Sequence, residues 1–238
     1  MLFGLKKGAN ANEPSAIAES KARKARSIAL LKEQQIPYID HLPVLEASTS
    51  DIIKVRTDWE IAQRAVCSIV TIQVAFDRIH EDDVENSTVF FGRILRAYEV
   101  KDDLTELEGK VFAGLLERED LIRFTWQYEA AWTLLWALGL VGELDFPSHI
   151  CDYQQAIQPI ATCKTMGDLL ALTHLRPIEE ILDAADLTYR YHWACVDARM
   201  HDQEPPMGLN EDVVVERHKG LNWLIGYSDD WDNTPADT

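Results

Sequence analysis

The segment from Arg118 to Val141 constrains the fold of this chain more than any other. Side chains three and four positions apart share one face of a helix, and both faces of this segment are apolar. One face carries Leu121, Phe124, Tyr128, Trp132 and Leu135, and the other carries Ile122, Trp126, Glu129, Thr133, Trp136 and Leu140. A helix that is apolar all round is buried all round. We therefore predict that this segment is the central helix of the domain.

Further helices are predicted from their start signals and their apolar periodicity. Thr57 and Thr105 each stand three residues before a glutamate, which is the capping-box pattern, while Pro177 suits a first helical turn and Asn210 an N-cap. The predicted helices cover residues 14–35, 57–76, 87–99, 105–116, 152–163, 165–175, 177–201 and 210–227.

No segment alternates as a half-buried β-strand does, and no repeat of fixed period occurs. The sequence therefore predicts an all-α fold, with one globular domain of about seven to nine helices around the central helix. We expect this domain to span residues 13–238 and to follow a flexible leader at residues 1–12.

The charge of the chain is acidic and unevenly distributed. The formal net charge is −17, but residues 1–35 carry +4, which leaves −21 on the remainder. A surface this acidic repels phosphate backbones, so nucleic-acid binding is not expected, whereas a partner with a basic surface is. The K-A-R-K-A-R run at residues 21–26 fits a nucleic-acid or localisation patch or, as we prefer, a basic helix docked on the acidic body. A narrow seam along that helix is formed by Ala18, Ala22, Ala25 and Ala29.

Neither an export signal nor a membrane span is found in the sequence. The N-terminal M-L-F-G-L-K-K is too short an apolar run for a secretory signal, and no stretch approaches the roughly 18 apolar residues that a span needs. The four cysteines are widely spaced, without a C-x-x-C pair, which is typical of reduced thiols. We expect a cytoplasmic protein that does not bind membranes.

Glu129 lies among apolar residues of the predicted central helix, and an unpaired ionised carboxylate is costly there. We expect it to pair with Arg199, Arg190 or His192, or to be protonated. In the preferred, structural interpretation, Glu129 forms a Glu–Arg or Glu–His bridge between two core helices. In the functional interpretation, a pocket between helices uses Glu129 as base or acid, His192 as a second titrating group and Arg199 as an anion clamp.

The predicted helix 177–201 separates into stripes. The stripe expected to face the core comprises Leu182, Ala185, Tyr189, Trp193, Val196 and Met200. The stripe expected to face solvent comprises Asp183, Asp186, Arg190, Asp197 and His201. Asp186 and Arg190 have the spacing of a surface ion pair, and Arg190 and Asp197 are additional candidate binding residues. His192 and Arg199 lie at the border of the apolar stripe.

No motif in the sequence indicates a cofactor or a metal. His149, Cys151 and Asp152 are metal-ligand types, but they lack the spacing of C-x-x-C pairs or H-E-x-x-H. The chain contains no G-x-G-x-x-G, P-loop or G-x-S-x-G motif either. We therefore expect no metal site and no cofactor.

Several stretches resemble one known family. They include W-Q-Y-E-A-A-W-T-L-L-W-A-L-G at 126–139, E-I-L-D-A-A-D-L-T-Y-R-Y-H-W-A-C-V-D-A-R at 180–199 and E-R-H-K-G-L-N-W-L-I-G-Y at 216–227. On these stretches the chain, over about residues 21–238, is similar to the bacterial proteins of the domain of unknown function 4272 (DUF4272). Because the family has no assigned chemistry, the resemblance implies a discrete folded unit and no activity.

The ending differs from the family pattern. Members tend to end in a tryptophan–aspartate pair and then threonine–aspartate–threonine. Here Trp231 and Asp232 supply the pair, but Ala236 stands at the first threonine position. If the tail folds back as a ligand-bearing lid, one hydroxyl group is missing from it.

Three functions are compatible with these observations. The preferred function is a non-enzymatic protein-interaction module, for example an immunity- or antitoxin-like protein that masks a basic toxin surface, with Trp231 as an anchor and Asp232 beside it. The alternative is an enzyme or small-molecule binder that uses Glu129, His192 and Arg199. Nucleic-acid binding through residues 21–26 is the weakest.

Overall fold

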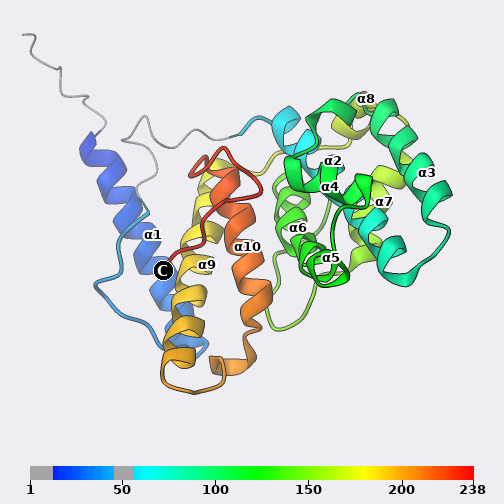
Figure 1. Ribbon diagram of the computed structural model, residues 1–238. Coiled ribbons are helices and arrows are strands. Elements are labelled where there is room, and N and C mark those ends of the chain that lie inside the picture. Colours follow the sequence, from blue (N-terminus) through cyan, green and yellow to red (C-terminus); the bar gives the residue numbers. More distant parts are fainter. Residues whose placement is uncertain (1–12, 46–55) are drawn as a thin grey trace, which may run out of the picture.

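The computed structural model describes residues 13–45 and 56–238, so the predicted leader at 1–12 lies outside the described residues. Within the described ranges the chain is helical and contains no β-strand (Figure 1). The helices are α1 (Glu13–Glu33), α2 (Asp58–His80), α3 (Val84–Ala97), α4 (Glu106–Ala113), α5 (Arg118–Thr125), α6 (Gln127–Ala137), α7 (Tyr153–Thr162), α8 (Met166–Leu170), α9 (Ile178–Met200) and α10 (Glu211–Leu224), with single 3₁₀ turns at Lys101–Asp103 and Pro206–Gly208. The all-α prediction is confirmed. The number of helices in this part of the chain falls within the expected range when α5 and α6 are counted as one bent helix.

Local sequence signals fix the starts of several helices. Thr57 and Thr105 both form complete capping boxes, in which the threonine side chain accepts from the backbone amide three residues later and the glutamate accepts from the threonine amide. Asn210 caps α10 by accepting from two backbone amides of its first turn. These three predictions are confirmed. Thr165 forms another capping box, with Asp168, at the start of α8.

The predicted central helix is bent and in part exposed. Trp126 separates α5 from α6, and hydrogen bonds spanning three residues, from Trp126 N to Arg123 O and from Glu129 N to Trp126 O, mark the bend. Every residue of α6 after Gln127 is buried, whereas Ile122 on α5 is 43% exposed. The expectation of burial on all sides therefore holds for α6 and is wrong for α5. α2 is similarly enclosed, from Ile61 to Ala75, and packs against α3, α4, α5 and α6.

Helices α1, α9, α10 and α6 lie side by side in that order, and the helices around α2 complete the molecule beyond α6 (Figure 1). α10 packs against both α6 and α9, so it stands between them. None of the described helices is long and apolar enough to cross a membrane.

The basic helix α1 docks on α9, as preferred from the sequence. The Arg23 guanidinium is buried and lies 3.4 Å from the carboxylate of Asp183, which also accepts from Arg26. Lys24 donates to backbone carbonyl groups, among them that of Leu42 at 2.7 Å. The basic side chains of residues 21–26 are thus largely engaged within the chain.

The predicted alanine seam of α1 is wrong as a packing surface. Its alanines are exposed, and the side chains that face the body are Ser20, Arg23, Ser27 and Leu31. The physical reason is that the buried Arg23 side chain finds partners on this face, a contact of 3.4 Å with Asp183 of α9 and a hydrogen bond to the carbonyl of Leu45.

Candidate functional site

Glu129 forms a buried bridge between α6 and α10. Its Oε2 accepts from Nε of Arg217 at 3.0 Å, and its Oε1 accepts from the backbone amide of Cys151 at 2.5 Å. Arg217 also donates from Nη1 to the carbonyl of Asp145 at 2.7 Å. Both charged side chains are at least nine-tenths buried. Because each charge is paired and hydrogen-bonded, this is the Glu–Arg bridge of the structural interpretation.

The partners expected for Glu129 were wrong. His192 pairs with His218, Arg190 with Asp186, and Arg199 with Glu211. The reason is the position of α10, which separates α9 from α6 and supplies the arginine that neutralises Glu129. The trio Glu129, His192 and Arg199 is therefore not assembled into one pocket.

His192 and His218 form a buried pair between α9 and α10. Their Nδ1 atoms are 3.0 Å apart, so one ring donates and the other accepts, and the rings meet edge to face with centroids 5.2 Å apart. Burial lowers the pKa of His192 to about 4, helped by the charge of Arg199. Burial and the neighbouring His192 lower the pKa of His218 to about 3. Both rings are consequently neutral at pH 7.

Asp186 and Arg190 do not lie on a solvent-exposed face, so that prediction was wrong. Both are buried, and Arg190 donates from Nε and Nη2 to the two oxygens of Asp186, each at 2.8 Å. α1 covers this side of α9, which converts a surface pair into a buried one. Asp197, one turn farther along the helix, stays partly exposed at 40% and lies 3.7 Å from His201.

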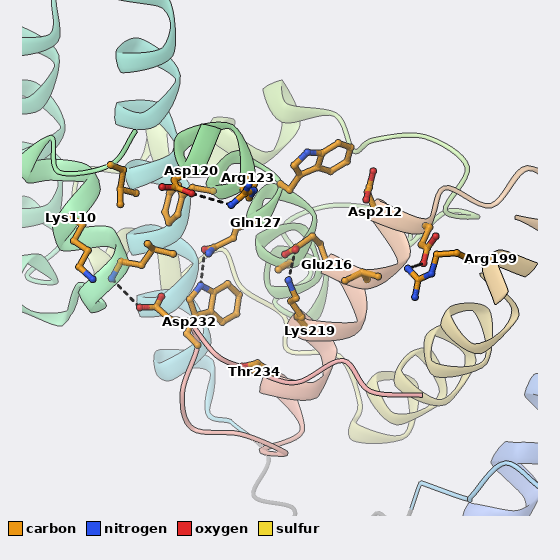
Figure 2. A pocket seen from close by; sticks show the side chains of 18 residues that line it. Lys110, Asp120, Arg123, Gln127, Arg199, Asp212, Glu216, Lys219, Asp232 and Thr234 are labelled. Carbon is orange, nitrogen blue, oxygen red and sulfur yellow. Dashed lines mark hydrogen bonds and ion pairs between the residues drawn. The ribbon is translucent and has the colours of Figure 1, made fainter. Parts of the chain in front are cut away.

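A pocket of about 700 Å³ brings three of the predicted site residues together (Figure 2). Its walls come from α4, α5, α6, α10 and the end of α9, and from the C-terminal segment around Trp231 to Thr234, and we call it the tail-capped pocket. Arg199, Trp231 and Asp232 line it, whereas Glu129, His192, Arg190 and Asp197 do not.

The tail is held against the body by its own side chains. Trp231 is 8% exposed, packs edge to face on Trp223 with ring centroids 5.5 Å apart, and donates from Nε1 to Gln127 at 3.2 Å. Asp232 accepts from the backbone amide of Leu107 at 3.0 Å. Trp231 is therefore an anchor within the chain, and a direct role for it as an anchor for a partner would require the tail to lift.

The cations that line this pocket are all paired with acidic side chains. These pairs are Lys110 with Glu106 at 2.6 Å, Arg123 with Asp120 at 3.1 Å, Arg199 with Glu211 at 2.5 Å, and Lys219 with Glu216 at 2.6 Å. The Lys110 pair raises the pKa of the lysine and lowers the pKa of Glu106 by hydrogen bonding first and charge second.

Acidic groups in the same lining have unused capacity to accept hydrogen bonds. Within residues 13–45 and 56–238, the exposed carboxylate of Asp212 forms no ion pair. In the same part of the chain, Oε2 of Glu216 and Oδ1 of Asp232 are buried without a hydrogen-bond partner. The pocket therefore offers acceptors and negative charge, and the cations of its lining are already neutralised.

The sequence pointed to Arg199, Trp231 and Asp232 but missed Asp212, Glu216 and Lys219, which share one face of α10. Their spacing of three and four residues was visible, but such a pattern is typical of any exposed helix face. No group of three or more His, Cys, Asp or Glu side chains in the described ranges is arranged to hold a metal ion.

Comparison with known proteins gives one match. The model of the family described as "Domain of unknown function (DUF4272)" matches residues 23–234, nearly the whole chain. No curated protein and no solved structure matches.

Proposed function

We propose that this chain, which belongs to the DUF4272 family, is a non-enzymatic interaction module that receives a basic side chain of a protein partner in the tail-capped pocket. The observation that carries the proposal is the imbalance of that lining, in which the cations are paired while Asp212, Glu216 and Asp232 keep unused acceptor oxygens. The exposed carboxylate of Asp212 can accept directly from an arginine or lysine of a partner, and the same donors would satisfy the buried oxygens of Glu216 and Asp232 once the lining opens.

The remaining charge of the chain supports the same partner class. With −17 overall, the protein attracts a basic surface at long range, and the pocket then fixes one side chain at short range. An immunity- or antitoxin-like protein that masks a basic toxin surface is one concrete version. The proposal includes a cytoplasmic location and no role in nucleic-acid binding.

The alternative, an enzyme or small-molecule binder built on Glu129, His192 and Arg199, has less support. It needs three side chains that belong to separate pairs in this fold. A catalytic role for Glu129 would also require it to leave Arg217, with which it shares a buried bridge.

The test is calorimetric titration of a hexa-arginine peptide into the full chain. We expect the double variant Asp212→Asn/Glu216→Gln to bind about ten-fold more weakly than the wild type, because two acceptors of the pocket lose their charge. The matched control Asp102→Asn/Glu179→Gln removes two exposed carboxylates outside the pocket and should change affinity less than two-fold.

Equal losses of affinity in both double variants would contradict the proposal, because peptide binding would then depend on the overall charge of the protein and not on the pocket. Affinity that does not weaken when salt is raised to about 1 M would contradict it as well, because an exposed ionic contact is screened at that concentration.

A further inference from the structure

A second hollow, separate from the tail-capped pocket, lies between α3 and α7 where both helices pack against α2. Its volume is about 690 Å³, and it shares no lining residue with the tail-capped pocket. We call it the α3–α7 groove. α2 contributes Ile69 and Val70, α3 contributes Phe90 and Ile94, and α7 contributes Ile157 to an apolar lining.

The groove is open to a ligand. Ile69 and Val70 are almost completely buried, whereas Phe90 is 58% exposed and Ala97 on the same helix is also exposed. α3 thus leaves apolar surface uncovered along the groove. Contiguous exposed apolar surface beside a hollow is characteristic of a binding site.

Two cationic side chains contribute to the otherwise apolar lining of the groove. Arg93 comes from α3, and Lys164 follows the end of α7. In the part of the chain that the structure describes, neither the guanidinium of Arg93 nor the ammonium of Lys164 forms an ion pair. The nearby Asp168 carboxylate accepts from the backbone amide of Lys164 at 3.2 Å. Both cations stand out in a chain of net charge −17, and Asp168 lies close enough to Lys164 for the ammonium to contribute to the lowered pKa of its carboxyl group.

We propose that the α3–α7 groove binds a long-chain carboxylate, with its acyl chain against the apolar lining and its head group between Arg93 and Lys164. The volume lies within the roughly 300–1,000 Å³ of small-molecule sites. Arginine suits a carboxylate head group because its guanidinium fork matches the two oxygens.

The first test is calorimetric titration of the full chain with sodium octanoate, decanoate and laurate below their micelle concentrations. Each buried methylene should tighten binding about three- to four-fold. Laurate should bind more tightly than dodecyltrimethylammonium, although the net charge of the protein favours the cation. Equal or tighter binding of the cationic amphiphile would overturn the proposal.

Variants then test the contribution of the carboxylate head group separately from that of the acyl chain. Arg93→Gln/Lys164→Gln should weaken laurate about ten-fold and leave dodecanol unchanged, because dodecanol has no charge to lose. Arg96→Gln, on the same helix but outside the lining, is the matched control and should change neither ligand.

Ala97→Trp should abolish binding of both ligands by filling the groove from an exposed position, with the far-ultraviolet circular dichroism unchanged. Unaltered laurate binding in this variant or in the double variant would show that the amphiphile binds elsewhere and would overturn the proposal. Since the groove and the tail-capped pocket share no residue, hexa-arginine binding is expected to be unaffected by Ala97→Trp.

Discussion

The enclosed side and the pocket side of α10 both carry charged or titratable side chains, but these side chains differ in whether the fold pairs them. On the enclosed side, Arg217 and His218 are buried and fully occupied by Glu129 and His192. On the pocket side, Asp212 and Glu216 are acidic groups with acceptor capacity to spare. A carboxylate, an arginine and two histidines are residue types that catalytic sites use. When these side chains are buried in a core, however, they must form ion pairs and hydrogen bonds with one another.

Polar side chains that are buried must pair within the fold. Only the polar side chains that do not need such a partner remain available to a ligand. Buried ionic groups without partners cost free energy, so the fold pairs them within the chain. The exposed carboxylate of Asp212 can instead hydrogen-bond to water and exchange that water for a ligand.

Removing the arginine on the enclosed side should have the largest effect. Arg217→Met leaves Glu129 buried and unpaired, and we expect the free energy of unfolding to fall by about 3–5 kcal/mol. Urea denaturation measures this change. The double variant Glu129→Met/Arg217→Met should lose much less than the sum of the single variants, because it removes both charges. Additive losses would mean that the pair contributes through packing alone.

Acid should destabilise the protein through the histidine pair. The folded-state pKa values of about 4 for His192 and about 3 for His218 lie below the unfolded value of about 6.5. The unfolded state therefore binds more protons once the pH falls below about 6.5, and stability is lost progressively down to the folded-state values. We expect a loss of about 2–4 kcal/mol between pH 7 and pH 5.

Urea denaturation at both pH values tests the histidine prediction. In His192→Phe/His218→Leu, most of this pH dependence should disappear. In the control His149→Ala, which removes an exposed histidine, it should persist. A double variant with the same pH dependence as the wild type would assign the effect to other groups.

A close approach between α10 and α6 should make Gly220 sensitive to a single methyl group. A Cβ there would lie 2.3 Å from Oγ1 of Thr133 and 2.7 Å from the carbonyl of Ala130. We expect Gly220→Ala to lower the free energy of unfolding by about 1–3 kcal/mol. Gly109 in α4 has no atom within 4 Å of its added Cβ, so Gly109→Ala should instead stabilise by about 0.5–1 kcal/mol. Thermal denaturation of both variants checks the two opposite signs.

Changing a carboxylate on the pocket side should have the smallest effect on stability. Asp212→Asn removes an exposed charge that forms no ion pair in the described ranges, and we expect a change within about 0.5 kcal/mol. A loss of unfolding free energy as large as that of Arg217→Met would show that Asp212 has a structural role. The two sides of α10 would then not differ in the way described above.

The fold was predictable because its signals are local. The threonines at 57 and 105 each need only a glutamate three residues later to start a helix, and α6 needs only its own apolar faces. The break at Trp126 was not visible, because a bend in a helix depends on what packs against each half. The orientation of α1 was missed for a related reason, since the partners of the buried Arg23 side chain, Asp183 and the carbonyl of Leu45, lie outside α1.

The candidate site was predictable only in part. Arg199, Trp231 and Asp232 were selected from sequence and lie in one pocket, although nothing in the sequence placed them together. The partners of Glu129 and His192 both belong to α10, and nothing in the sequence places α10 rather than α9 beside α6.

By itself, the sequence determined the helical class, the starts of several helices and the acidic charge, because each depends on neighbours within a few residues or on composition alone. It also determined that Glu129 needs a partner. Only the tertiary structure decided which partner, because the order α9, α10, α6 places Arg217 rather than Arg199 beside the carboxylate. Pairing across helices depends on distances in space, and these are set by how whole helices pack.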